Sequence, residues 1–208
     1  MNILIADDHT LFRDGLKRIL NEKIPNVNFG EAQNENDLFN LLKKDSWQLI
    51  ILDLNMPGRG GIEILKDLKI FYKEIPILIL SMYPEEQFAI RVIKAGANGY
   101  LTKGVSPTEL ITAINTIIEG NVYFSKEVSK LIAQDFQGNK NNLLEKLSDR
   151  EFEVFLKIAT GESLTSIANQ LSLSVKTIST YRTHILEKLD LKTNADITRL
   201  AIKNDLIK

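Results

Sequence analysis

Hydrophobic and polar residues follow two alternating patterns over the first 120 positions of the chain. Five short, mostly apolar stretches have the length of strands: residues 3–6, 27–32, 49–52, 77–80 and 99–101. The run at 49–52 is continuously apolar, as in a strand buried on both faces of a parallel sheet. Between the strands, apolar residues recur at helical spacing, for example Leu16, Ile19 and Leu20. Five strands, each followed by a helix, predict an α/β fold with a doubly wound parallel sheet.

The pattern changes after residue 120. Residues 121–135 keep partial helical spacing, whereas residues 137–142 (Gln-Gly-Asn-Lys-Asn-Asn) are polar and turn-rich, which is typical of a linker. We therefore predict a first domain at 1–120, a helical and polar linker at 121–146, and a second domain at 147–208.

The second domain is predicted to be all-α. Its four helices each begin at a residue that can cap a helix: Ser148, Ser163, Ser174 and Thr193. The helix that begins at Ser163 is short and ends at a turn near Leu173, and a longer helix follows. This order of short helix, tight turn and longer helix is typical of a helix-turn-helix module.

Composition narrows the class of protein. A chain of 208 residues suits two modest domains. It has no cysteine, and its two histidines, His9 and His184, lie far apart in the sequence, so neither a disulfide framework nor a zinc site of Cys or His ligands is expected. No apolar run approaches the roughly 18 residues of a membrane span, and the chain opens on a strand rather than a signal peptide. We expect a soluble cytoplasmic protein with no membrane partner.

Candidate chemistry gathers where the predicted strands end. Asp7 and Asp8 follow the first strand, Asp53 the third, Ser81 the fourth and Lys103 the fifth. Ligands of doubly wound sheets bind at the carboxyl ends of the strands, and a flavodoxin-like order makes the first and third strands neighbours. We therefore expect the three carboxylates to converge.

Converging carboxylates repel one another unless a cation lies between them, and Mg²⁺ suits a site made of carboxylates, water and phosphate. A carboxylate such as that of Asp53 can act as a nucleophile and form an acyl phosphate. The ammonium of Lys103 and the hydroxyl of Ser81 suit the oxygens of an acquired phosphoryl group.

Residues 1–120 resemble the receiver domain of two-component response regulators. The matching stretches are Ile5-Ala6-Asp7-Asp8-His9, Leu52-Asp53-Leu54-Asn55-Met56-Pro57, Ser81 and Gly99-Tyr100-Leu101-Thr102-Lys103. The resemblance implies that Asp53 is the phosphoacceptor. It also implies that Asp8, the Asp53 carboxylate and the main-chain carbonyl of Asn55 bind Mg²⁺, with Asp7 helping through water.

By the same resemblance, Ser81 and Lys103 would hold the phosphoryl oxygens. Tyr100 falls at the position of the family's switch aromatic, which turns inward when the hydroxyl of Ser81 moves toward the phosphate. Two positions depart from the common pattern: many receivers have Pro where this chain has Gly104, and many have Thr in place of Ser81. The serine keeps the hydroxyl, but without a methyl group its rotamer is less restricted.

Hydrolysis of an acyl phosphate on Asp53 needs an in-line water molecule. Asn55 and Tyr83 stand at the family positions that set the lifetime of the phosphate. A bulky ring at Tyr83 could obstruct that water, and an unchanged dephosphorylation rate in Tyr83→Ala would contradict this hypothesis.

Charge alone does not identify a partner of the second domain, because nine Lys or Arg residues oppose eight Asp or Glu residues from Leu147 onward. The distribution is more informative, since most of these cations lie in or after the longer helix of the helix-turn-helix. The exposed face of that helix carries small hydroxyls and cations, which suit phosphates and base edges.

Residues 147–208 resemble the DNA-binding domain of NarL/FixJ, or LuxR-type, regulators. The matches include Leu-Ser-Asp-Arg-Glu at 147–151, Gly161, Ile167-Ala168, Leu173-Ser174, Lys176-Thr177-Ile178 and Ile185-Leu186-Glu187-Lys188-Leu189. The family positions that face the major groove are Ser179, Thr180 and Thr183. Those near the DNA backbone are Lys176, Thr177, Tyr181, Arg182 and Lys188. Many members have Lys in place of Ser179, so the recognised sequence stays open.

The two resemblances together imply phosphorylation-controlled transcription. A sensor histidine kinase would phosphorylate Asp53 with Mg²⁺, and the phosphorylated protein would form a homodimer on double-stranded promoter DNA. The last helix, residues 194–203, would pair the two DNA-binding domains over half-sites about one helical turn apart. RNA polymerase is a further candidate partner. The protein is expected to be a phosphoacceptor and not an enzyme that turns over a substrate.

Two other classes of protein stay open on the residues alone. A phosphatase of haloacid-dehalogenase type also uses an aspartyl phosphate, but its Asp-x-Asp pattern after the first strand differs from Ala6-Asp7-Asp8-His9. A LuxR-type transcription factor that works without phosphorylation is the other alternative, and the full acidic set argues against it.

Overall fold

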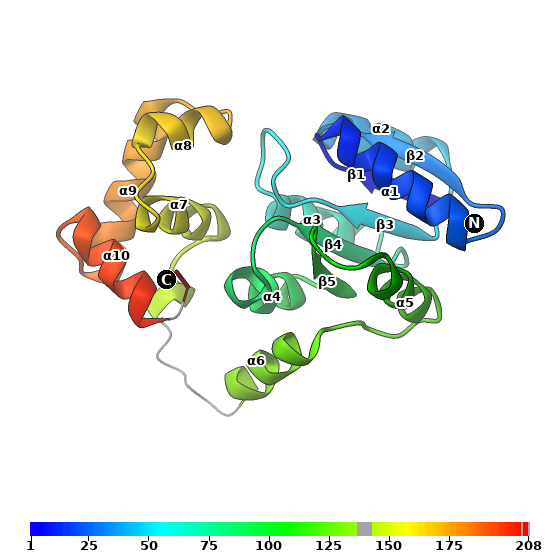
Figure 1. Cartoon of the computed structure of the whole chain (residues 1–208). Helices are drawn as coiled ribbons and strands as arrows, with labels where there is room; N and C mark the ends of the chain where they lie inside the picture. The colour runs from blue at the N-terminus through cyan, green and yellow to red at the C-terminus, as the bar shows by residue number, and fades with distance from the viewer. Residues whose placement is uncertain (137–142, 205, 208) are drawn as a thin grey trace. The chain divides into compact units, whose positions relative to one another are not determined.

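The computed structural model describes residues 1–136, 143–204 and 206–207, so the linker predicted at 137–142 lies outside the described residues. The chain divides into two compact units, Met1–Ala133 and Gln134–Lys208 (Figure 1). No helix in the described part of the chain is long and apolar enough to cross a membrane.

The first unit is built on a parallel sheet of five strands (Figure 1). The strands are β1 (Asn2–Ala6), β2 (Asn28–Ala32), β3 (Leu49–Leu52), β4 (Ile77–Ser81) and β5 (Gly99–Thr102). Their order across the sheet is β2-β1-β3-β4-β5, and each pair is parallel. The predicted doubly wound fold, with β1 beside β3, is confirmed.

Five helices connect and follow the strands: α1 (Thr10–Lys23), α2 (Glu35–Lys44), α3 (Gly61–Phe71), α4 (Glu85–Lys94) and α5 (Pro107–Ile118). Two of these helices begin at a capping residue whose side chain accepts a hydrogen bond from the main-chain amide three residues later. Asn34 accepts a hydrogen bond from the Asp37 amide at the start of α2, and Ser106 accepts one from the Glu109 amide at the start of α5.

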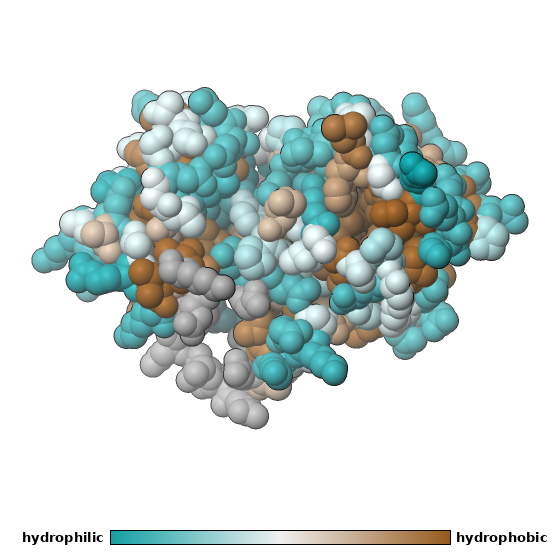
Figure 2. All heavy atoms as spheres, in the orientation of Figure 1, coloured by the Kyte–Doolittle hydropathy of each residue, from teal (hydrophilic) through white to brown (hydrophobic). Residues whose placement is uncertain are grey.

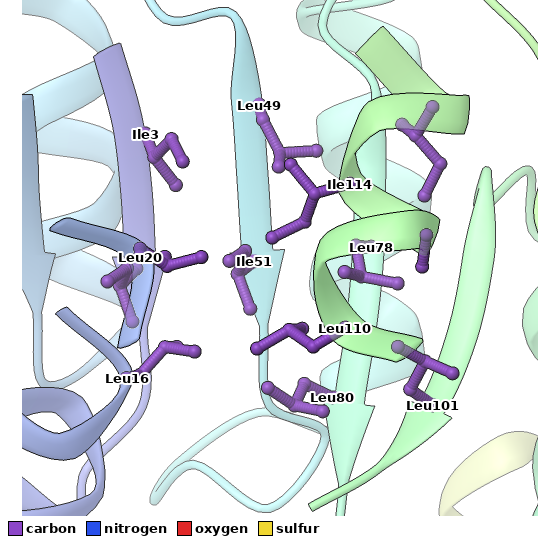
Figure 3. Close-up of a cluster of buried hydrophobic side chains, with 13 residues drawn as sticks. Ile3, Leu16, Leu20, Leu49, Ile51, Leu78, Leu80, Leu101, Leu110 and Ile114 are labelled. Atoms are coloured by element: carbon purple, nitrogen blue, oxygen red, sulfur yellow. The ribbon is translucent and has the colours of Figure 1, made fainter. Parts of the chain in front are cut away.

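A hydrophobic core lies between the sheet and the helices α1 and α5 (Figure 3). Alternate residues of the inner strands point to this face, for example Ile3 of β1 and Ile51 of β3. Leu16 and Leu20 of α1 and Ile114 of α5 pack against them, and all five side chains are at most 3% exposed. Helices α2, α3 and α4 cover the opposite face of the sheet (Figure 1).

The chain after α5 returns to the edge of the sheet. Tyr123 forms a single parallel bridge with Gly99, the first residue of β5, and its amide donates to the Asn98 carbonyl at 2.8 Å. A Cβ atom at Gly99 would lie 2.8 Å from Ile117 Cδ1 and 3.1 Å from the Tyr123 carbonyl oxygen, so any other residue here would require its neighbours to shift. Helix α6 (Lys126–Phe136) follows, as the partial helical spacing of residues 121–135 predicted.

The second unit is helical throughout its described residues. It contains a 3₁₀ turn, η1 (Leu143–Lys146), and four helices: α7 (Asp149–Ala159), α8 (Leu164–Gln170), α9 (Val175–Leu189) and α10 (Asn194–Lys203). The four predicted caps are confirmed at Ser148, Ser163, Ser174 and Thr193, and the first and last are full capping boxes. The sequence pattern did not predict η1.

Buried apolar side chains from four helices form the core of this unit, including Phe155, Ile167, Ile178 and Ile197. The face of the molecule in Figure 2 is mostly hydrophilic over both units, with patches of apolar residues between the polar ones. Helices α8 and α9 meet at the tight turn that the helix-turn-helix prediction requires, where Ser172 takes a positive φ of 53°.

Candidate functional site

The register of the sheet brings two of the predicted acids together. Ala6 pairs with Leu52, so Asp7 and Asp53 directly follow neighbouring strands. The Asp53 amide donates to the Ala6 carbonyl at 2.9 Å, and both aspartates are at most 2% exposed. Two carboxylates therefore lie side by side in a place that water barely reaches.

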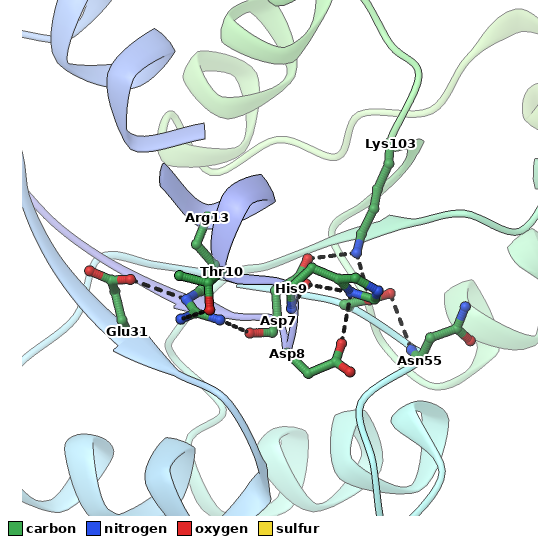
Figure 4. A network of polar contacts seen from close by, with 9 residues as sticks. Asp7, Asp8, His9, Thr10, Arg13, Glu31, Asn55 and Lys103 are labelled. Atoms are coloured by element: carbon green, nitrogen blue, oxygen red, sulfur yellow. Dashed lines mark hydrogen bonds and ion pairs between the residues drawn. The ribbon is translucent and has the colours of Figure 1, made fainter. Parts of the chain in front are cut away.

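Lys103 is the cation of this site. Ser81 pairs with Thr102, and the amide of Lys103 donates to the Ser81 carbonyl at 2.8 Å, so the lysine leaves β5 at the same edge of the sheet. Its Nζ atom lies 2.7 Å from an oxygen of Asp7 and 2.7 Å from an oxygen of Asp53, and its side chain is 4% exposed. Figure 4 shows Lys103 reaching down toward the loop that carries Asp7 and Asp8.

Burial raises the pKa of the Asp53 carboxyl above its ordinary value. The charge and the hydrogen bond of Lys103 oppose this effect without cancelling it, and the negative charge of Asp7 adds to it. The site therefore holds more negative charge than its one lysine neutralises, which is a setting that favours a divalent cation.

The donor set fits such a cation. Ligand atoms of Asp7, Asp8, His9 and Asp53 all lie within 4.8 Å of one another. Within residues 1–136 and 143–204, Asp8 Oδ1 and Asn55 Oδ1 are buried but make no hydrogen bond of acceptable geometry. Buried acceptors without a donor are costly, and an ion or its water molecules would supply what they lack.

His9 is the member of this group that the sequence did not single out as a ligand. Its Nδ1 lies 2.9 Å from Asp8 Oδ1 and 3.2 Å from Asp7 Oδ1, which are ion pairs only when the imidazole is protonated. Its position in the sequence, directly after Asp7 and Asp8, is the feature that could have identified it as a possible ligand.

The remaining predicted residues of the receiver lie on β4 and β5 or in the loops that follow β3 and β4. Ser81 is fully buried, and its hydroxyl accepts a hydrogen bond from the Tyr83 amide at 3.3 Å. Tyr100 is also fully buried, and its hydroxyl donates to the Tyr83 carbonyl at 2.8 Å. The ring of Tyr83 stacks on Phe88 of α4 with 4.4 Å between the ring centroids. The main-chain N–H of Asn55 donates to Asp53 Oδ1 at 3.1 Å.

The recognition helix of the predicted helix-turn-helix is α9. Its buried face is formed by Ile178, Ile185 and Leu189. Of the eight predicted DNA contacts, five are exposed: Lys176, Ser179, Thr180, Thr183 and Lys188; the other three, Thr177, Tyr181 and Arg182, are half-buried. The predicted set therefore occupies the accessible side and the flanks of α9.

Two of the predicted backbone contacts already have partners inside the unit. Lys188 Nζ donates to Glu151 Oε2 at 2.6 Å, and Arg182 Nε donates to Asn194 Oδ1 at 2.6 Å. Burial acts to raise the pKa of Glu151, but the hydrogen bonds from Lys188 and Ser148 outweigh it and hold the pKa below its ordinary value. Glu151 thus joins the start of α7 to the recognition helix.

Comparison with known proteins follows the same division of the chain. Residues 3–115 match the family model of the response regulator receiver domain, and residues 145–201 match that of the LuxR family of bacterial regulatory proteins. The response regulator UvrY of Escherichia coli K12 is 32% identical over 209 residues, which covers 99% of this chain and 95% of UvrY.

Solved structures of the response regulator RcsB of Salmonella are similar over both units. One RcsB structure from Salmonella typhimurium covers 98% of each chain with a TM-score of 0.71 and 29% identity. Another, RcsB from Salmonella enterica serovar Typhimurium bound to the rprA promoter with the phosphomimetic BeF₃⁻, covers 96% of this chain and 97% of RcsB with a TM-score of 0.64 and 30% identity. The chain therefore belongs to the two-component response regulators that combine a receiver domain with a LuxR-type DNA-binding domain.

Proposed function

We propose that Asp53 accepts a phosphoryl group from a sensor histidine kinase and that this charge controls DNA binding by the second unit. The observation that carries the proposal is the meeting of Asp7, Asp53 and Lys103 at one edge of the sheet, with 2.7 Å from the ammonium to each carboxylate. A carboxylate oxygen of Asp53 would attack phosphorus, and the P–O bond would form as the P–N bond of the kinase phosphohistidine breaks. The histidine leaves with the electron pair of that bond.

Lys103 is the residue best placed to hold the product. Its ammonium already binds Asp53, and after transfer it can bind a phosphoryl oxygen on the same side chain. Asp8, Asp53 and the Asn55 carbonyl would hold Mg²⁺, with Asp7 acting through water, and the ion would neutralise charge on the phosphoryl oxygens. The side-chain Oδ1 atoms of Asp8 and Asn55, which are buried and make no hydrogen bond of acceptable geometry, support a cation or its water molecules at this place.

Ser81 and Tyr100 are proposed to carry the signal away from Asp53. If the Ser81 hydroxyl turns to a phosphoryl oxygen, it releases the Tyr83 amide that it now accepts from. Tyr83 also holds the Tyr100 hydroxyl through its carbonyl, so one loop connects the phosphorylation site to the buried ring on β5.

The same loop leads into α4, whose first residue contacts the segment after α5. The hydroxyl of Ser125 donates to the carboxylate of Glu85, and Ser125 also accepts from the Val128 amide at the start of α6. Movement of the loop from Ser81 to Glu85 would loosen this contact and alter α6, which leads to the second unit. This contact is a route from the phosphate to the DNA-binding domain.

The second unit is proposed to bind promoter DNA as a homodimer through α9, with α10 pairing the two copies. Lys176, Ser179, Thr180 and Thr183 are the exposed residues that would meet the DNA. Because its DNA target lies in the bacterial cytoplasm, the protein would act there. We assign residues 1–120 to the receiver, 121–146 to the connection and 147–208 to DNA binding.

A beryllofluoride titration of promoter affinity tests this function, with the mass of the free protein measured under the same conditions. Beryllofluoride with Mg²⁺ should tighten DNA binding and raise the fraction of dimer. The Asp53→Asn variant should show neither the tighter binding nor the larger dimer fraction. Equal affinity and equal mass with and without beryllofluoride would favour a LuxR-type regulator that works without phosphorylation.

A further inference from the structure

A buried arginine beneath the acidic loop has no part in the chemistry described above. Arg13 lies on α1 and is 2% exposed. An arginine charge is almost never buried unless it is paired, because removing it from water is expensive. The contacts of this guanidinium therefore indicate the structural role of the buried side chain.

The guanidinium binds three different segments (Figure 4). Nη1 donates to the main-chain carbonyl of Asp7 at 2.6 Å, Nε donates to Glu31 Oε2 of β2 at 3.1 Å, and Nη2 donates to Thr10 Oγ1 at 3.3 Å. The first of these bonds is the shortest and reaches the residue that begins the acidic loop.

Main-chain hydrogen bonds fix both ends of the loop of residues 7–9. The Asp7 amide donates to the Ala32 carbonyl at 3.0 Å, and the His9 carbonyl accepts from the Arg13 amide at 3.1 Å. The Asp7 carbonyl between these points is held by the Arg13 side chain. Asp8 comes next in the chain, so its position depends on a peptide fixed by Arg13.

Electrostatic repulsion acts on this loop. Asp7, Asp8 and Asp53 repel one another when ionised, and the ammonium of Lys103 contacts Asp7 and Asp53 but has no ion pair with Asp8 in the described structure. Without a fixed backbone, repulsion would move Asp7 and Asp8 away from Asp53, and the ligand oxygens would separate. A buried positive charge on the far side of the peptide also favours the negative charge that the loop bears.

We propose that Arg13 is a positioning residue that holds the acidic loop in the geometry that binds a divalent cation. The proposal rests on the function proposed above, because it gives the acidic loop the role of a metal site. Arg13 acts through the main chain of Asp7 and touches no reacting atom.

The rival explanation is that Arg13 only ties α1 to β2 through Glu31. A second residue already makes that tie, because Lys17 Nζ of α1 lies 2.5 Å from Glu31 Oε1. The ion pair between α1 and β2 therefore survives the loss of Arg13, whereas the bond to the Asp7 carbonyl does not. Metal affinity separates the two explanations, since a simple tie between α1 and β2 would change stability and leave the metal site intact.

The test compares Mn²⁺ and Mg²⁺ binding to the full-length protein, to three variants that replace an arginine, and to Asp53→Asn, which removes a proposed metal ligand. Mn²⁺ serves as the probe because it takes the same oxygen ligands and is detected by electron paramagnetic resonance, and Mg²⁺ affinity follows from competition. The arginine variants are Arg13→Met, Arg13→Lys and the control Arg18→Met, which removes an exposed arginine of the same helix. All measurements are made at a temperature at which circular dichroism shows each variant folded.

Arg13→Met should weaken binding of both ions about 10-fold or more, the usual effect of removing a group that orients metal ligands. Arg13→Lys keeps the charge but loses the forked geometry, so it should weaken binding by a smaller factor, and Arg18→Met should bind like the native protein. Binding by Arg13→Met equal to that of the native protein, even with a lower melting temperature, would overturn the proposal.

If Arg13→Met does not fold, Arg13→Lys decides, and native-like affinity in that variant would overturn the proposal. Failure of the native protein to bind either ion would overturn the proposed function as well. Native binding that is lost in Asp53→Asn but unchanged in both Arg13 variants would overturn the role of Arg13 alone.

Discussion

Replacing Lys103 with Met removes the ammonium that lies 2.7 Å from the carboxylates of both Asp7 and Asp53, the buried pair of the site. Methionine keeps the length and apolar stem of lysine and can still pack on the Phe12 ring, whose centroid lies 4.6 Å from Nζ. The variant therefore tests charge with little change in packing.

The magnitude follows from the burial and the distances. At 2.7 Å and an effective dielectric constant near 20, each ion pair has a gross attraction of about 6 kcal/mol. Desolvation offsets most of that gain while the pair exists, but removing one partner leaves the others buried and unpaired. We expect Lys103→Met to lower the free energy of unfolding by about 3 kcal/mol at pH 7.5 without Mg²⁺.

The loss should depend on pH in a defined direction. Burial already raises the pKa of Asp53, and the loss of Lys103 should raise it further. A carboxyl whose pKa is higher in the folded protein than in the unfolded chain supports stability at low pH, and this support is lost as pH rises through the folded pKa. Lys103→Met should therefore be closer to the native protein at pH 5 than at pH 7.5, and Mg²⁺ should reduce the difference at pH 7.5.

Urea denaturation followed by tryptophan fluorescence is the assay, because Trp47 is the only tryptophan and belongs to the receiver unit. The control is Lys103→Met with Asp53→Asn, which removes the unpaired acid as well and should recover most of the lost stability. A loss below about 1 kcal/mol that does not change with pH or Mg²⁺ would refute the reasoning, since it would mean that the cluster is already screened by solvent.

Three further predictions test the signal route and the DNA interface. Tyr100→Phe removes the buried bond to the Tyr83 carbonyl and should cost about 1 kcal/mol in urea denaturation; an unchanged midpoint would count against that bond. Ser125→Ala removes the contact with Glu85 and should raise the DNA affinity of the unphosphorylated protein, and an affinity equal to the native value would exclude this contact from the route. Arg182→Ala should weaken DNA binding across sequences and reduce the salt slope by about 1, whereas an unaltered slope would contradict a phosphate contact.

The fold could be predicted to a large extent because its signals are local. Apolar runs of strand length and capping residues such as Ser148, Ser163 and Thr193 act over three or four positions, and the structure confirms each of them. The convergence of the acids also followed from the sequence, since the end of each strand is fixed by the strand itself and parallel strands end at one edge.

The contacts that the sequence did not predict depend on how the elements pack against one another. Lys188 and Glu151 are 37 positions apart, so the pairing that draws a predicted DNA contact into the fold depends on how α9 packs on α7. Arg13 lies on the buried face of α1 with Leu16 and Leu20, but the helical spacing does not indicate that its guanidinium binds the Asp7 carbonyl. Such bonds follow from tertiary packing rather than from residue spacing.

Phosphorylation by acetyl phosphate with Mg²⁺, read by intact-protein mass spectrometry, tests the central role of Asp53 most directly. The native protein should gain the mass of one phosphoryl group, and Asp53→Ala should gain none while Asp8 and Lys103 remain in place. Labelling of Asp53→Ala to the native level would contradict the assignment of Asp53 as the acceptor.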